Sequence, residues 1–377
     1  MTMKTKNFKG LVFGDVHLFH PHTTSDHVVS VLYELVNNFK DFADLDVIVI
    51  EGDLFDSLMP YNSTYVKIIE KWITDLLIAC AKHDVALRAL EGTPSHDMRQ
   101  TAAIVKLKEN LGLEVDLRYI EDIEIEVNEE RGWTIGYVPD EMESPLSKCY
   151  DRMVALMAER GLTKLDFMVM HGSFEFQFPS YFDVDSHSSS LWMELVNFYI
   201  FIGHVHDRAV YGNIIASGSV DRFRHNEEKP KGITYFETND TVCSYRFIDN
   251  KRSKIYTTLD VSHISEEALS RFTDTLKKLP PKSHIRFRTQ NRLDAANLIS
   301  YFEKLFPLII FTFIVSDVKD KQKTKQLVYP TFDHFNSERI KLTKENLADL
   351  LLNELIKKPE LAKREERARE ILNGHIK

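Results

Sequence analysis

This sequence is poor in the features that mark secreted, redox-active or membrane-spanning proteins. It has only three cysteines among 377 residues, and Cys80, Cys149 and Cys243 are too scattered for a zinc knuckle or a redox motif. Apolar runs of about 20 residues, which a membrane-spanning helix requires, are missing as well. Residues 1–10 are polar and have no apolar centre typical of a signal peptide. We therefore expect a cytoplasmic protein that does not associate with membranes.

The sequence also lacks the excess of positive charge with which proteins bind nucleic acid through bulk electrostatics. Its formal net charge is −9, whereas affinity for a phosphate backbone comes from lysine and arginine. This balance disfavours a passive nucleic-acid binder but does not exclude a nuclease. Bound divalent cations reverse the sign of the charge at an active site, and a partner subunit can supply a positive surface.

The chain has 377 residues, which is longer than a domain with a single hydrophobic core usually is. Its length therefore predicts more than one domain. Residues 1–250 alternate short apolar runs with helical periodicity, which is typical of an α/β domain. Within it, residues 25–39 and 62–83 are predicted scaffold helices. Residues 118–127 and 133–138 are predicted strands of one sheet, separated by a polar turn.

The pattern changes after a charged junction near residue 250. Residues 251–335 predict a small α+β unit, with a strand at 285–288, a helix at 293–306 and a buried strand at 308–315. Residues 336–377 are predicted to form two short amphipathic helices that are separated by a helix break. The apolar faces of these terminal helices either bind a partner or fold back on their own domain.

Five short apolar runs each end in a motif that contains aspartate or histidine. In chain order the motifs are Gly14-Asp15-Val16-His17, Gly52-Asp53-Leu54-Phe55-Asp56, Gly92-Thr93-Pro94-Ser95-His96-Asp97, His171-Gly172 and Gly203-His204-Val205-His206. Short buried strands followed by such loops place these side chains at the carboxyl ends of strands, where open α/β sheets bind their ligands. One such histidine is usually a surface or core residue, but five ordered motifs indicate a site.

The residue types in the motifs predict a site for two divalent cations. Two cations about 3.5–4 Å apart activate a water molecule and bind both the attacking and the leaving oxygen of a phosphoester. Carboxylate and imidazole ligands suit manganese and similar metals. We expect Asp15 and His17 to bind one cation, because they lie two residues apart on one loop. Asp53 is the expected bridging carboxylate, because a carboxylate has two oxygens.

The histidines of the later motifs complete the expected site. His171 and His204 are predicted to bind one metal and His206 the other. His96 has a different predicted role, because an imidazole that faces the scissile phosphate can stabilise its charge and protonate the leaving oxygen. Asp97 either holds the His96 ring or caps a helix. Histidines outside the motifs, such as the one at position 187, are interpreted as loop or surface residues.

These motifs resemble those of the calcineurin-like metallophosphoesterases. Residues 52–64, with Gly-Asp-Leu-Phe-Asp-Ser and a following proline, and residues 218–232, with Gly-Ser-Val-Asp-Arg-Phe and a later Lys-Gly, resemble the SbcD-type DNA repair nucleases in particular. The resemblance covers most of residues 8–237. It implies an α/β fold with a metallophosphoesterase β-sandwich flanked by helices, a small α+β capping domain and a C-terminal helical pair. The compact form also resembles phage recombination nuclease subunits.

The resemblance further implies a function, cofactors and partners. It implies a Mn²⁺-dependent exonuclease and endonuclease, with Mg²⁺ as an alternative metal, that processes DNA ends in recombination and repair. In this reading residues 1–250 are the nuclease domain, residues 251–335 guide DNA, and residues 336–377 bind an SMC-like coiled-coil ATPase of the SbcC type. Family likeness also implies a homodimer formed by helices of the nuclease domain, which residues 25–39 or 62–83 can provide.

One motif departs from the family pattern. The family has Gly-Asn-His-Asp, in which the asparagine amide oxygen binds a metal, whereas here the loop is longer and Ser95 precedes His96. A serine hydroxyl is shorter and neutral, so it binds a metal directly or through a water molecule. His96 is the residue expected to assist the leaving group. The metal ligands implied by the resemblance are Asp15, His17, Asp53, Ser95, His171, His204 and His206.

Two other functions remain open at the level of sequence. A metallophosphatase or a cyclic-nucleotide phosphodiesterase has the same kind of site, but a small-substrate enzyme does not need the additional C-terminal domains. A non-catalytic scaffold that binds DNA ends or the ATPase would follow if the change at Ser95 had removed one metal position. This last function ranks lowest, because the other ligands and His96 are all present.

Overall fold

The computed structural model divides the chain into two compact units, Met1–Ser316 and Asp317–Lys377. The residues that the structure describes are 7–60, 62–129, 132–140, 145–179, 181, 184–239, 242–262 and 266–315. The predicted terminal helices, within residues 336–377, lie outside them. Among the described helices, none combines the length and the apolar character needed to cross a membrane.

The first sheet has six strands in the order β12-β11-β1-β2-β3-β4. Its strands are β1 (Lys9–Phe13), β2 (Val47–Ile50), β3 (Ala86–Leu90), β4 (Leu117–Ile120), β11 (Gly232–Asn239) and β12 (Val242–Asp249). Strands β1 to β4 are parallel to one another, whereas β11 and β12 are added as an antiparallel pair beside β1. All four residues of β2 are buried, as expected for a parallel strand that is covered on both faces.

The second sheet also has six strands, in the order β5-β6-β7-β8-β10-β9. Its strands are β5 (Glu124–Asn128), β6 (Trp133–Val138), β7 (Leu165–His171), β8 (Val196–Gly203), β9 (Ala209–Tyr211) and β10 (Ile214–Ala216). The four central strands are parallel, and the edge strands β5 and β9 run antiparallel to their neighbours. Each sheet therefore has a parallel centre whose strands all end on the same side.

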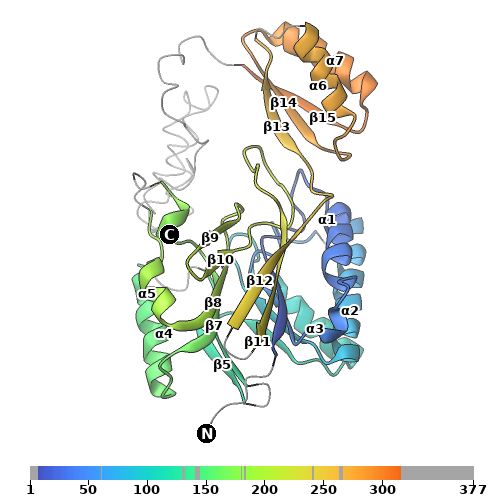
Figure 1. The fold of residues 1–377 in the computed structure, drawn as a ribbon. Helices are drawn as coiled ribbons and strands as arrows, with labels where there is room; N and C mark the ends of the chain where they lie inside the picture. Colours follow the sequence, from blue (N-terminus) through green and yellow to red (C-terminus); the bar gives the residue numbers. More distant parts are fainter. Residues whose placement is uncertain are drawn as a thin grey trace, which may run out of the picture. The chain divides into compact units, whose positions relative to one another are not determined.

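The two sheets pack face to face and carry helices on their outer faces (Figure 1). In β2, Val47 and Val49 belong to the core between the sheets, whereas Ile48 and Ile50 belong to the core beneath the helices, as the twofold periodicity of a strand requires. The helices are α1 (Ser25–Leu32), α2 (Thr64–His83) and α3 (Ala103–Leu111) on the first sheet, and α4 (Ser147–Glu159) and α5 (Ser189–Glu194) on the second. The expected fold class, an α/β sandwich flanked by helices, is confirmed.

A buried ion pair joins the two sheets. The Arg88 guanidinium, on β3, donates to both carboxylate oxygens of Glu126, on β5, at 2.8 and 2.6 Å. The Tyr137 hydroxyl donates to the same carboxylate, and the Asp116 carbonyl accepts from Arg88 at 2.7 Å. Arg88 is fully buried. Both charges are therefore satisfied inside the sandwich by partners from several strands.

Both predicted scaffold helices are present. α2 begins directly after Ser63, whose hydroxyl accepts from the amide of Tyr65 and so caps the helix. The predicted helix at residues 25–39 is α1 followed by one π-helical turn, Tyr33–Asn37.

The predicted single strand at residues 118–127 was wrong. The chain forms two strands there, and β4 belongs to the first sheet whereas β5 belongs to the second. Residues 121–123 break the strand because the chain must leave one sheet to reach the other. The apolar pattern is similar on both sides of the break, so periodicity alone does not reveal it.

A third, three-stranded parallel sheet has the order β13-β14-β15. It comprises β13 (Tyr256–Asp260), β14 (His284–Thr289) and β15 (Ile310–Val315), with the helices α6 (Glu266–Leu276) and α7 (Arg292–Leu305). The predicted strand at 285–288 and helix at 293–306 are confirmed as parts of β14 and α7. The strand predicted as buried at 308–315 is largely exposed, because β15 is an edge strand.

Candidate metal centre

Loops that follow five parallel strands bring the predicted side chains together. Asp15 follows β1, Asp53 follows β2, His96 lies on the loop after β3, His171 ends β7 and His204 follows β8. Asp15, His17, Asp53 and His204 all have positive φ angles, which residues other than glycine rarely adopt. Backbone strain of this kind is common where a site imposes the conformation.

The loops are packed tightly against one another. The Asp15 amide donates to the Gly52 carbonyl at 3.1 Å, and the Val16 amide donates to the Asp53 carbonyl at 2.8 Å. Gly52 has a φ of +91°, and a Cβ atom there would lie 2.2 Å from Nδ1 of His171. Only glycine therefore fits at this position, which explains the glycine before Asp53.

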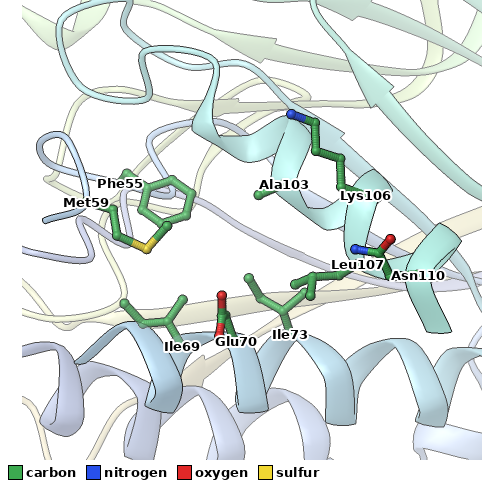
Figure 2. Close-up of a pocket in the computed structure, with 9 residues that line it drawn as sticks. All are labelled: Phe55, Met59, Ile69, Glu70, Ile73, Ala103, Lys106, Leu107 and Asn110. Carbon is green, nitrogen blue, oxygen red and sulfur yellow. The ribbon is translucent and has the colours of Figure 1, made fainter. Parts of the chain in front are cut away.

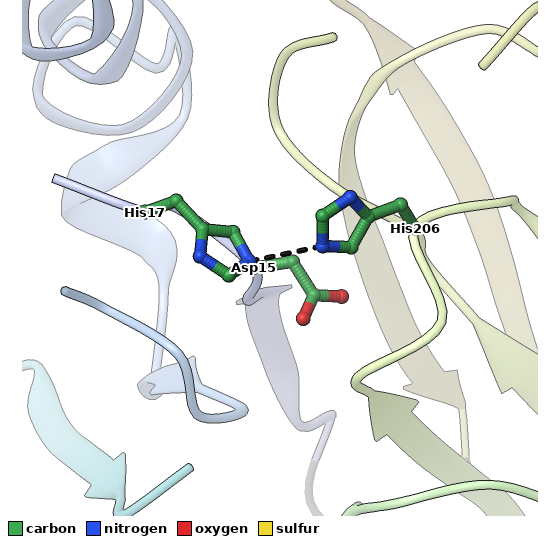
Figure 3. A group of neighbouring side chains, drawn as sticks. All are labelled: Asp15, His17 and His206. Carbon is green, nitrogen blue, oxygen red and sulfur yellow. Dashed lines mark hydrogen bonds between the residues drawn. The ribbon is translucent and has the colours of Figure 1, made fainter. Parts of the chain in front are cut away.

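The first group of candidate ligands is Asp15, His17 and His206 (Figure 3). The Nε2 atoms of the two histidines lie 2.9 Å apart. Behind each ring stands a carboxylate: Asp56 lies 3.2 Å from Nδ1 of His17, and Glu227 lies 2.7 Å from Nδ1 of His206. Because each Nδ1 faces a carboxylate, the two Nε2 atoms are directed at one point. A cation at that point would contact both rings, as in metal sites where carboxylates orient the histidines.

The second group is Asp53, His171 and His204. His171 Nε2 lies 3.3 Å from Asp53 Oδ1, and its Nδ1 lies 2.6 Å from the Glu51 carbonyl oxygen. That carbonyl can only accept, so Nδ1 carries the proton and Nε2 is a free acceptor in the neutral ring. The amide of His204 donates to both oxygens of Asp15, at 2.9 and 3.0 Å. The two groups are thus joined by a direct hydrogen bond.

Asp53 lies between the groups. A third set of candidate ligand atoms consists of His17, Asp53 and His96, so Asp53 shares one set with each side of the site. This is the position that a bridging carboxylate requires. Asp53 is 2% exposed and His171 is 1% exposed, so their charges are shielded from water.

The electrostatics of the site reflect crowded carboxylates and imidazoles. Burial tends to raise the pKa of Asp53, but the charges of His171, His17 and His96 hold that pKa well below its usual range. Burial tends to lower the pKa of His17, but Asp56, Asp53 and Asp15 raise it overall. These carboxylates therefore strongly favour a positive charge among them, and such buried histidine and aspartate groups can hold a metal ion.

His96 lies at the edge of the site and is partly exposed. Its Nδ1 lies 3.0 Å from the Asp56 carbonyl oxygen, which fixes the proton on Nδ1 and leaves Nε2 available. Asp97 does not hold the ring. Its carboxylate accepts instead from the amides of Phe55 and Gly92, both at 2.8 Å, and so ties the loop after β2 to the loop after β3.

The structure does not bring Ser95 into the site in the way that the sequence suggested. Ser95 is exposed. Thr93 is buried, and its hydroxyl lies within hydrogen-bonding distance of Asp53, His204 and Asp140. The position of Thr93 in the sequence could have indicated that it belongs to the site. Thr93 lies three residues beyond the end of β3, as Asp53 lies three residues beyond the end of β2.

Three further acidic residues of the site received no role from the sequence. Asp56 and Glu227 each lie beside a histidine of the first group, and they fall within residues 52–64 and 218–232. Asp140 follows the buried strand β6 by two residues, as Asp15 follows β1.

His187, interpreted as a surface residue, is in fact buried, and burial lowers its pKa to about 4.

Comparisons with known proteins leave the family of this chain open. No protein-family model matches the sequence, and no curated protein is significantly similar to it. Among solved structures, the protein TT1561 of Thermus thermophilus is 10% identical with a TM-score of 0.38. A second solved structure is 11% identical with a TM-score of 0.37. Each similarity covers 64% of this chain and 99% of the solved chain.

Proposed function

We propose that this protein is a two-metal phosphodiesterase, and specifically a cytoplasmic SbcD-type DNA nuclease subunit of the calcineurin-like metallophosphoesterases. The observation that carries the proposal is the closeness of two largely buried ligand groups, linked by a third set in which Asp53 lies beside His17 and His96. Two metal positions joined by a carboxylate are the arrangement used to hydrolyse phosphoesters.

The residues would hold the metals in two sets. Asp15, His17 and His206 would hold one ion, His171 and His204 the other, and Asp53 both. When bound, such a pair of Mn²⁺ ions supplies an activated water and neutralises charge on the phosphoester. The side chains themselves set the geometry, because Asp56 and Glu227 fix the orientation of the first set of imidazoles.

His96 has the geometry of a general acid. Its Nδ1 proton is directed at the Asp56 carbonyl, so its Nε2 is the atom that can meet the substrate. Partial exposure lets that ring contact a phosphodiester that enters from solvent. In this function His96 would act with a second proton on Nε2, from which it would stabilise charge on the phosphoryl oxygens and protonate the leaving oxygen.

The choice of DNA as substrate is supported by the two segments that resemble the nuclease family. In the second of them, Arg222 donates to the carbonyls of Glu227, Glu228 and Lys229, and Lys231 donates to the carbonyl of His206. These bonds fold residues 222–231 against the metal centre. The segment is therefore part of the site, which links its family-like sequence to the proposed chemistry.

The proposed partners follow the same family likeness. Residues 336–377, which lie outside the described part of the chain, would bind the SMC-like ATPase, and residues 251–335 would guide DNA. Between α2 and α3 the surface has a hollow of about 190 Å³ that is lined by both apolar and charged side chains (Figure 2). Its charged residues, Glu70 and Lys106, have opposite signs. The proposed homodimer would form through residues 25–39 or 62–83, and in the second case it would cover this hollow.

The test is a nuclease assay with the full chain, Mn²⁺ and linear duplex DNA of defined ends, with and without an SbcC-type ATPase subunit. We expect Mn²⁺-dependent degradation, and we expect His96→Ser to abolish it while metal content stays near that of the unchanged protein. A phosphomonoester and a cyclic nucleotide serve as competing substrates. Faster turnover of either of these than of DNA, or intact metal binding without any DNA cleavage, would refute the proposed substrate.

A further inference from the structure

The Thr93 hydroxyl is surrounded by more hydrogen-bond acceptors than it can donate to. Its Oγ1 lies 3.3 Å from Asp53 Oδ2 and 3.1 Å from Asp140 Oδ2. It also lies 3.4 Å from Nε2 of His171 and 3.2 Å from Nδ1 of His204. A hydroxyl donates only one hydrogen bond. Both carboxylates can only accept, so at least one of them lacks a donor from Thr93.

The atoms around this hydroxyl have the chemistry of a cation site. Two carboxylates and two imidazoles each have an atom within 3.4 Å of this hydroxyl, and Thr93 and His171 are buried. Asp140 Oδ2 also lies 3.7 Å from Nδ1 of His204, so it faces a second member of the set. The buried Asp53 carboxylate favours a positive charge beside it, and mixed oxygen and nitrogen donors suit Mn²⁺.

We infer that Asp140 is a further metal ligand, which completes the Asp53, His171 and His204 set from the loop after β6. This inference rests on the proposed function and deepens it. In the family pattern a neutral amide stands in the loop after β3, and in this chain that loop offers the buried Thr93 hydroxyl instead. Asp140 supplies a charged oxygen from a different strand. The second metal position would then have two carboxylates and two imidazoles, and it would not need the amide.

A purely structural role for Asp140 makes a different prediction. If Asp140 only accepts the Thr93 hydrogen bond, removing either partner has the same effect on the site. If Asp140 binds the metal, Asp140→Asn weakens binding more than Thr93→Val does, because the valine variant keeps the carboxylate. The Thr93 amide, which donates to Asp53 Oδ1 at 2.6 Å, is retained in both variants.

The experiment is a titration of the full-length protein with Mn²⁺, followed by the electron paramagnetic resonance signal of free Mn²⁺. We expect two bound ions in the unchanged protein. Asp140→Asn should weaken one of them by more than about tenfold, the range seen when groups that support a metal are lost. Asp140→Glu should retain both ions, and Thr93→Val should lie closer to the unchanged protein than Asp140→Asn does. Asp122→Asn, at the surface pair with Arg152, is the matched control.

The outcomes separate this inference from the proposed function. Two ions bound with unchanged affinity in Asp140→Asn would refute the ligand role and leave the two-metal site standing. Equal losses in Asp140→Asn and Thr93→Val would assign Asp140 to hydrogen bonding alone. Failure of the unchanged protein to bind Mn²⁺ would overturn both proposals. Circular dichroism of each variant identifies unfolding. If Asp140→Asn unfolds, the Mn²⁺ affinity of Asp140→Glu is compared with that of the unchanged protein to decide the role of the carboxylate.

Discussion

His17 and His206 lie 189 positions apart in the chain, yet their Nε2 atoms are 2.9 Å apart. Each ring is oriented from behind by a carboxylate, Asp56 for His17 and Glu227 for His206. Two nitrogen lone pairs directed at one point repel each other unless a proton or a cation lies between them. The folded chain therefore holds these two rings in an arrangement that a metal ion stabilises.

Metal binding should accordingly stabilise the folded protein. We expect the melting temperature to rise with Mn²⁺ and to fall when EDTA is added. A ligand at 100 times its dissociation constant stabilises the folded state by about 2.7 kcal/mol. His206→Ala should lose most of this gain. His83→Ala, at the end of α2, should keep it, and calorimetry with and without Mn²⁺ checks both. An equal gain in His206→Ala would show that the rings do not bind the metal.

Glu227 should control the metal affinity of His206. Its carboxylate accepts from the imidazole, and Phe223 and Lys231 hold it in place, so it fixes which nitrogen faces the site. We expect Glu227→Gln to weaken Mn²⁺ binding by about 10–100-fold with the fold intact. Glu175→Gln is the control, because that carboxylate binds Ser189 instead. Isothermal titration of both variants gives the comparison, and equal affinities would contradict the orienting role.

Asp97 should contribute to stability and to activity together. Its carboxylate accepts from the amides of Phe55 and Gly92, and burial raises its pKa to about 7. Asp97→Ala leaves two buried amides without this acceptor, which costs about 1–3 kcal/mol for each unsatisfied group. We expect a lower urea midpoint and reduced cleavage, because the loops that carry Asp53 and His96 separate. Reduced cleavage with unchanged stability would point instead to a direct role in the reaction.

The ion pair between the sheets should be important for stability alone. Arg88→Met leaves the Glu126 carboxylate buried without its main partner, which costs about 3–5 kcal/mol. The double variant Arg88→Met/Glu126→Leu should recover most of this loss, because replacing a whole buried pair with apolar side chains is often neutral. Urea unfolding of the single and double variants measures the difference. A double variant no more stable than Arg88→Met would contradict this account.

Local patterns were sufficient to predict much of the fold. The apolar stripe of α2 depends on residues close together in the chain, and so does the order of short strands followed by aspartate or histidine. Local patterns did not predict that the chain changes sheets between β4 and β5, because strands of either sheet have similar periodicity. They also missed β12 and β13.

The amino-acid sequence by itself determined the chemistry available at this site: aspartates and histidines in loops after successive buried strands. Only the tertiary structure decided which polar side chains join them, because that depends on how two sheets bring separate strand ends together. The buried Thr93 lies among the acids and imidazoles, and the exposed Ser95 does not, although two positions separate them. Asp140, Asp56 and Glu227 enter the site for the same reason, since their neighbours there are distant in the chain.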